Sequence, residues 1–182
     1  MYTADIMLAA GITEPRVSTF LGPLNDAADE FEVNTPMRAA IFLAQVLWES
    51  DDLKYTRELY TPGRPTPAQA KYDGQYGNTA PGDGYKYRGG GLIEITFKDN
   101  YAECSQALFG TDILVQNPAL IAQPATACRS AGWFWQTRGC NEMADDGDFT
   151  GVTRRINGGL NGLSGRIGIY KAIAPAFGLS ST

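Results

Sequence analysis

Two glutamates near the middle of the chain, Glu49 and Glu58, have the types and spacing that acid–base chemistry would need. Glu49 ends the long apolar segment 35–50, which is expected to be a buried helix. A carboxyl group that loses hydration at such a position has a raised pKa, and a raised pKa suits a general acid. The alternative is that Glu49 only marks the place where the helix reaches the surface.

Glu58 can cooperate with Glu49 only if the chain turns back between them. On a straight helix the two would lie on opposite faces, because nine residues rotate about 900° and rise about 13.5 Å. The aspartates in segment 51–53 are compatible with a helix end there. The alternative for Glu58 is a solvated carboxylate paired with Arg57 or Lys54.

Composition narrows the chemistry further. The 182 residues include no histidine, which excludes Ser-His-Asp and Cys-His nucleophiles and zinc sites with histidine ligands. The net charge of −5 comes without a basic patch, so nucleic acid is not an expected partner. No metal or cofactor is expected, and carboxylates remain the best candidates for proton transfer.

The cysteines form no CxxC pair, and their odd number favours reduced, buried thiols over a disulfide framework. One bridge plus one free thiol is the alternative. The three are Cys104, Cys128 and Cys140. Cys140, which follows Gly139, is expected to be the most accessible of them.

The hydrophobic pattern predicts a mainly α protein with one small β element. Residues 3–33 should form two short helices that are broken near Gly22-Pro23, and the glycine- and proline-rich segment 61–90 should be irregular surface structure. The alternation from Leu92 to Phe97 predicts a half-buried strand. The other expected helices span 36–50, 98–109, 124–138, 148–156 and 163–176.

Polar residues in these elements could line a wet cleft. Arg38, Gln45 and Glu49 form a stripe on the central helix, and this stripe lines either a wet cleft or an ordinary exposed face. On the predicted strand Glu94 and Thr96 point the same way. The glycines of segment 89–91 allow a ligand or another segment to approach the backbone. The aromatic residues 133–135 are expected in the core rather than on a sugar platform.

Several segments occur in an order that resembles glycoside hydrolase family 19, the chitinase-like family, and specifically its compact bacteriophage endolysin branch. The resemblance covers about residues 35–175. Its segments are Gln45–Ser50, Tyr87–Tyr101, Ser130–Trp135, Arg154–Gly162 and Arg166–Tyr170.

The resemblance implies a bilobal, lysozyme-like helical fold around a saccharide cleft, in a single catalytic domain that spans 1–182. It also implies roles for individual residues. Glu49 corresponds to the general acid, Glu58 to the general base and Thr96 to the residue that positions the water. Substrate contacts are expected from Arg38, Gln45, Tyr87, Glu94, Asn100, Asn157 and Arg166.

The chain departs from the family pattern at several positions. Trp48 replaces the histidine before the acid, and Asp51-Asp52 replaces a pair of glycines. Gly90 stands where the family has arginine, and Glu94 where it has glutamine. This last change adds a third carboxylate, which makes Glu94 a rival to Glu58 for the role of base.

We therefore predict an endolysin that hydrolyses the β-1,4 bond between N-acetylmuramic acid and N-acetylglucosamine with inversion, a reaction that needs two carboxyl groups. The beginning of the chain lacks the pattern of a signal peptide, and no segment has the length of a membrane span. The expectation is a monomer that stays in the host bacterial cytoplasm until a separate membrane-permeabilising protein releases it to the glycan strands. The alternatives are a chitinase, a bacterial antagonism effector and a non-enzymatic saccharide-binding or phage structural relative.

Overall fold

The computed structural model describes residues 1–59 and 66–180. Helices dominate this part of the chain, and its strand pairing is limited to isolated bridges, so the predicted mainly α class is confirmed. The α-helices are α1 (Ala4–Ala9), α2 (Glu14–Glu30), α3 (Pro36–Glu49), α4 (Pro67–Lys71), α5 (Asp83–Lys86), α6 (Lys98–Phe109), α7 (Ile113–Gln116), α8 (Pro124–Thr137), α9 (Cys140–Asp145), α10 (Phe149–Asn157) and α11 (Leu163–Ile173). The 3₁₀ helices are η1 (Pro118–Ala122) and η2 (Ala174–Phe177).

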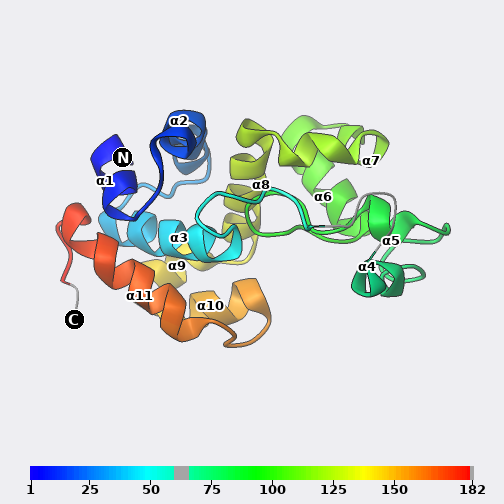
Figure 1. The fold of residues 1–182 in the computed structure, drawn as a ribbon. Helices are drawn as coiled ribbons and strands as arrows, with labels where there is room; N and C mark the ends of the chain where they lie inside the picture. The colour runs from blue at the N-terminus through cyan, green and yellow to red at the C-terminus, as the bar shows by residue number, and fades with distance from the viewer. Residues whose placement is uncertain (60–65, 181–182) are drawn as a thin grey trace.

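The helices form two groups joined by α8 (Figure 1). One group contains α1, α2, α3, α9, α10 and α11, and the other contains α4 to α7. Helix α8 packs against α2 and α9 of the first group and against α6 of the second. This arrangement is the bilobal shape that the sequence predicted.

Helix α3 is the buried centre of the first lobe. The Thr35 side chain accepts a hydrogen bond from the Arg38 N–H at 3.2 Å, and Pro36 occupies the first turn, where its missing N–H costs nothing. The residues from Ala39 to Leu47 are all buried, and α11 packs along the helix. The predicted central helix is confirmed, with its end at Glu49.

The predicted break near Gly22-Pro23 is wrong. Pro23 lies inside α2, and the chain breaks earlier, after α1, where Gly11 has a φ of 87°. A proline within a helix costs about 3 kcal/mol. Tertiary packing offsets that cost, because the apolar face of α2 is buried and α2 packs along α8.

The second lobe contains more helix than the sequence suggested. Part of the segment 61–90 lies outside the described residues, and the remainder holds α4 and α5 in addition to turns. A capping box starts α4, since Thr66 and Gln69 each accept a hydrogen bond from the other's backbone N–H. The buried Asn78 joins this region to α6 by accepting from the Lys98 N–H at 3.0 Å.

The strand predicted from Leu92 to Phe97 is absent from the structure. Glu94 and Phe97 have φ values of 56° and 77°, so the segment is a series of turns. Leu92 and Ile95 are both buried because the chain turns between them. On an extended strand these two residues would face opposite sides. The only pairing within the segment is the bridge between Ile95 and Gly90.

All three cysteines are free and buried, as the reduced-thiol prediction requires. The expectation that Cys140 is the most accessible is wrong, because it is as fully buried as the other two. Burial raises the pKa of the Cys104 and Cys140 thiols to about 12. No helix in residues 1–59 and 66–180 is long and apolar enough to cross a membrane.

The contact between the end of α2 and helix α8 is tight enough to test. A Cβ on Gly132 would lie 2.3 Å from the Phe31 ring, so Gly132→Ala must displace that ring. We expect a loss of about 1–2 kcal/mol in the free energy of unfolding, measured by urea denaturation. The matched control Gly22→Ala meets open space on α2 and should gain about 0.5 kcal/mol. Equal effects of the two changes would contradict the packing argument.

Candidate functional site

A left-handed turn directly after α3 returns the chain towards the helix end. Asp51, Asp52 and Leu53 have φ values of 51°, 58° and 62°, a conformation that costs about 1–2 kcal/mol per L-residue. The Ser50 hydroxyl stabilises the turn, donating to the Val46 carbonyl at 2.7 Å and accepting from the Leu53 N–H at 2.9 Å. The turn that the sequence required for cooperation between the glutamates is therefore present.

Glu58 is fixed by the backbone of the glycine run. Its N–H donates to the Gly89 carbonyl at 2.8 Å, and its Oε2 accepts from the Gly89 N–H at 3.1 Å. Lys54 pairs with Asp51 at 3.3 Å, so it does not serve as the partner considered for Glu58. Glu58 is consequently held in place by the protein, whereas a merely solvated carboxylate would be free to move.

Gly89 allows Glu58 and Glu94 to approach each other. A Cβ on Gly89 would lie 3.1 Å from Glu94 Cβ and 3.4 Å from Glu58 Cβ. Although much of Glu94 is exposed, protein atoms desolvate its carboxyl group and raise its pKa, and the charges of Glu58 and Glu49 add to that rise. Three carboxyl groups thus act on one another at this site.

Glu49 is anchored by a buried arginine. Arg166 Nη2 donates to Glu49 Oε1, and Arg166 Nη1 donates to Gln45 Oε1 at 2.6 Å. Gln45 Nε2 in turn donates to Thr153 Oγ1 at 3.0 Å, which links α3, α10 and α11. The Arg166 side chain is 0% exposed and that of Glu49 is 17% exposed, so Glu49 is the member of this network that reaches solvent.

Four of the residues predicted to contact substrate are either buried or far along α3 from Glu49. Gln45, Tyr87 and Arg166 are buried, so as folded they position other groups. Arg38 is at the opposite end of α3 from Glu49, where it pairs with Asp145 at 2.5 Å. Sequence spacing identified the stripe on α3, but it did not show that helices α9 to α11 cover most of it.

Three other predicted residues line a pocket of about 150 Å³ between the lobes, which we call the aromatic pocket. Thr96 Oγ1 donates to the Glu94 carbonyl at 2.8 Å, and Asn100 Nδ2 donates to the Thr96 carbonyl at 2.7 Å. This pocket therefore brings together Glu94, Thr96 and Asn100. Its lining residues are Ile93, Glu94, Ile95, Thr96, Phe97, Asn100, Trp133, Phe134, Arg138 and Ile156.

The aromatic residues 133–135, all expected in the core, do not share one environment. Trp135 is a core residue, as expected, with its Nε1 donating to Asn141 Oδ1 at 2.7 Å. Trp133 and Phe134, in contrast, are only partly buried and line the pocket. Three consecutive residues of a helix face three directions, so no single assignment could fit them all.

Asn157 and Trp48 both reach solvent, and Trp48 lies near Arg166. Asn157 is exposed at the end of α10. Trp48 lies against Gly162 and Gly165 at the start of α11, since a Cβ on either glycine would clash with its ring. Trp48 is still 42% exposed, and the Arg166 guanidinium lies 5.9 Å from the centre of its ring.

Tyr72 is a site residue that sequence reasoning missed. Burial raises the pKa of its hydroxyl, and the charges of Glu58 and Glu94 raise it further, so it belongs to the same group of acidic side chains. Within the described part of the chain no cluster of histidine, cysteine, aspartate and glutamate could hold a metal ion. The chemistry that these residues offer is proton donation and proton acceptance by separate carboxyl groups beside an aromatic surface.

Comparison with known proteins identifies the family. The family model described as chitinase class I, a glycoside hydrolase family 19 model, matches residues 40–153. This chain belongs to glycoside hydrolase family 19. The resemblance noted from ordered sequence segments is thereby confirmed at the level of the family.

The similar family 19 proteins are longer than this chain. A glycosyl hydrolase family 19 domain-containing protein of Haemophilus influenzae is 44% identical over 97 residues, which are 53% of this chain and 46% of that protein. Endochitinase 1 of Theobroma cacao is 30% identical, over 98% of this chain and 62% of its own length.

Solved structures of family 19 chitinases share the fold. Chitinase C from Streptomyces griseus superposes with a TM-score of 0.70 at 25% identity, covering 93% of this chain and 78% of its own. A class IV chitinase from Zea mays gives a TM-score of 0.61 at 22% identity, over 100% of this chain and 84% of its own. The lysozyme-like helical fold of this family is therefore shown.

The Arg166 network should be essential to stability. Arg166→Met leaves the Glu49 carboxylate and the Gln45 amide without their buried partner, so we expect a loss of about 3–5 kcal/mol in the free energy of unfolding. The double variant Arg166→Met/Glu49→Gln should recover part of that loss, because a neutral amide is less costly to leave unpaired. Urea denaturation of the parent, the two single variants and the double variant measures both effects, and purely additive losses would contradict the coupling.

The raised pKa of Glu94 makes a prediction about pH. The folded state binds the Glu94 proton more tightly than the unfolded chain does, so ionised Glu94 destabilises the fold at pH values above its folded pKa. Glu94→Gln should therefore stabilise the protein at about pH 7, and the gain should vanish as the pH falls below the ordinary value of 4.5. Urea midpoints across this range test the sign.

Glu103→Gln on α6 is the matched control, since this glutamate is exposed and distant in sequence from the glycine run. A Glu94→Gln gain that stayed constant down to acidic pH would show that the effect is one of packing and not of charge.

Proposed function

We propose that this protein is an endolysin that hydrolyses the β-1,4 bond between N-acetylmuramic acid and N-acetylglucosamine in peptidoglycan. The observation that supports a glycosidase is the group of interacting carboxyls, Glu49, Glu58 and Glu94, beside an aromatic pocket. Glycoside hydrolysis requires two carboxyl groups and neither metal nor histidine. The chain has no histidine, and proton transfer by carboxylates fits that composition.

Glu49 acts as the general acid in this proposal. It is the solvent-reaching end of a buried network, and the bridge from Arg166 to Gln45 fixes its carboxyl group while leaving an oxygen for the glycosidic bond. A fixed donor is effective because proton transfer requires a heavy-atom distance of about 2.6–3.2 Å.

Glu58 acts as the general base that activates water. The Gly89 N–H holds its Oε2, so the carboxylate is oriented before substrate binds. Attack by water on the face opposite the leaving group would invert the anomeric centre. Thr96 helps to position that water in our proposal, and Asn100 and Asn157 contact the sugar.

Peptidoglycan is favoured as the substrate by the ordered segments that resemble the phage endolysin branch. The three free, buried cysteines fit an enzyme that works reduced, and the host cytoplasm before lysis is the compartment we propose. The proposed enzyme acts as a monomer on glycan strands after another protein has permeabilised the membrane. A chitinase is the second candidate, favoured by relatives that are named chitinases or endochitinases.

Purified cell walls and chitin oligomers, offered separately to the enzyme, distinguish these candidates. We expect wall turbidity to fall and mass spectrometry to show muropeptides with reducing N-acetylmuramic acid. Products that end in 1,6-anhydromuramic acid would mean a lytic transglycosylase, and N-acetylglucosamine at the reducing end would mean a glucosaminidase. Cleavage of chitin alone would establish the second candidate. NMR of freshly released products identifies their anomer and so tests whether the reaction inverts the configuration.

Glu49→Gln should reduce hydrolysis by about 10²-fold or more, because the amide can still accept the Arg166 hydrogen bond but cannot donate an acidic proton. Hydrolysis of the substrate identified above, with Glu103→Gln as control, measures the loss. A folded Glu49→Gln protein with near-normal activity would exclude Glu49 as the acid.

Glu58→Gln should lose far more activity than Glu94→Gln in the same assay. The reason is that Glu58 is held by the Gly89 backbone in a position matching the family's base, whereas Glu94 replaces a glutamine of the family pattern. The opposite ranking of the two variants would assign the base to Glu94.

A further inference from the structure

The end of the aromatic pocket that lies on α8 carries a positive charge. Arg138 follows the last turn of α8 and lines the pocket beside Trp133 and Phe134. Its guanidinium carbon lies 5.0 Å from the centre of the Phe134 ring. The side chain is exposed, so the guanidinium is accessible to a molecule bound in the pocket without any rearrangement of the core.

Arg138 has no acidic partner in the described structure. The ion pairs in residues 1–59 and 66–180 are Arg38–Asp145, Lys54–Asp51, Arg129–Glu30 and Arg166–Glu49. Glu94 lines the same pocket, yet it forms no ion pair with Arg138. The pocket thus has a carboxyl group and a guanidinium that remain separate.

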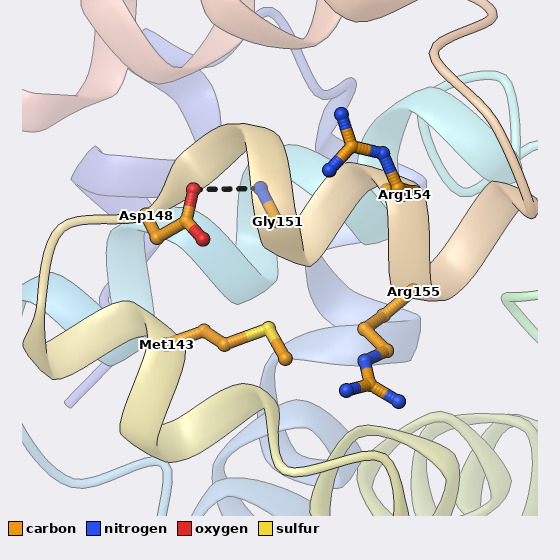
Figure 2. Close-up of a pocket in the computed structure, with 5 residues that line it drawn as sticks. All are labelled: Met143, Asp148, Gly151, Arg154 and Arg155. Atoms are coloured by element: carbon orange, nitrogen blue, oxygen red, sulfur yellow. Dashed lines mark hydrogen bonds between the residues drawn. The ribbon is translucent and has the colours of Figure 1, made fainter.

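Two further arginines, Arg154 and Arg155 on α10, line a different pocket of about 440 Å³ with Met143. In Figure 2, Arg155 extends to the side of α10 that faces Met143, whereas Arg154 extends to the opposite side. Neither is among the residues that line the aromatic pocket, whose guanidinium is that of Arg138.

This separation of charge determines which ligands fit. The carboxyl groups of Glu58 and Glu94 would repel an anionic substrate, and the chain as a whole carries a net charge of −5. An acidic group on a glycan is accommodated best at the arginine end, where a guanidinium offers paired N–H donors to a carboxylate. A neutral chitin chain has no carboxylate to pair with this guanidinium.

We propose that Arg138 binds a carboxylate of the peptide that substitutes muramic acid. This contact would select peptide-bearing glycan over unsubstituted glycan and set its direction in the site, with the acidic substituent away from the catalytic glutamates. The inference rests on the proposed function, since it names the substrate feature that the same site recognises. Arg138 is a specificity determinant in this scheme, and proton transfer remains with the glutamates.

Binding measured in the Glu49→Gln protein tests the proposal without turnover. The probes are a soluble peptide-bearing glycan oligomer from digested walls, the same oligomer with its peptide carboxylates converted to amides, and an N-acetylglucosamine tetramer. Calorimetry should show the peptide-bearing oligomer binding about tenfold or more tightly than the amidated one, as expected for one charge-assisted contact. Removal of the peptide by an amidase would not give a neutral comparison, because that hydrolysis leaves a free lactyl carboxylate on muramic acid.

Substitution of arginines shows whether Arg138 is responsible for the preference. In the same background, Arg138→Gln should remove most of the ratio between the two dissociation constants. Arg154→Gln is the matched control, because it removes an equal charge from a residue that does not line the aromatic pocket, and the ratio should survive. Thermal unfolding confirms that each variant is folded.

Two results would overturn the inference. A ratio near one in the parent protein would show that the peptide carboxylate is not recognised, even if walls are cleaved and the proposed function holds. An Arg138→Gln protein that weakens both oligomers equally would place Arg138 against the sugar or in packing. Failure of the proposed function is a separate result, namely an active Glu49 enzyme that cleaves chitin oligomers and leaves walls intact.

Discussion

The buried Arg166 guanidinium is the interaction on which the site depends. It donates to Glu49 and Gln45 from the first turns of α11, and Gln45 continues the connection to Thr153 on α10. An unpaired charge at this depth would be strongly destabilising, so the three helices must meet in the register that satisfies it. The same bonds that hold the lobe together therefore hold the carboxyl group of Glu49 where solvent reaches it.

The second constraint is the left-handed turn of Asp51, Asp52 and Leu53. Three successive residues in this conformation are costly, and the bonds of Ser50 and the burial of Leu53 offset the cost. The turn redirects the chain so that Glu58 pairs with the glycine run instead of continuing along α3. The strained turn therefore allows Glu58 to reach Gly89, on whose other side Glu94 lies.

The glycine run, residues 89–91, packs closely against side chains of the second lobe and of α8. Gly90 has room for the Tyr101 hydroxyl and Ile121 only because it lacks a Cβ, and Gly91 has a φ of 78° beside Ser130. This close packing replaces the strand that alternation suggested. It leaves Glu94 and Thr96 on turns that line the aromatic pocket, with the arginine end of that pocket supplied by α8.

The sequence by itself determined the helical class, the bounds of α3, α6 and α8 to within one residue, the need for a turn after α3 and the family, and it singled out Glu49 and Glu58 as candidates. These follow from local patterns and from spacing along the chain. Only the tertiary structure decided that Pro23 stays helical, that Leu92–Phe97 is not a strand, and that Arg166 and Gln45 are buried. The physical reason is that packing between distant segments can override a local preference of a few kcal/mol, and burial depends on which helices cover a face.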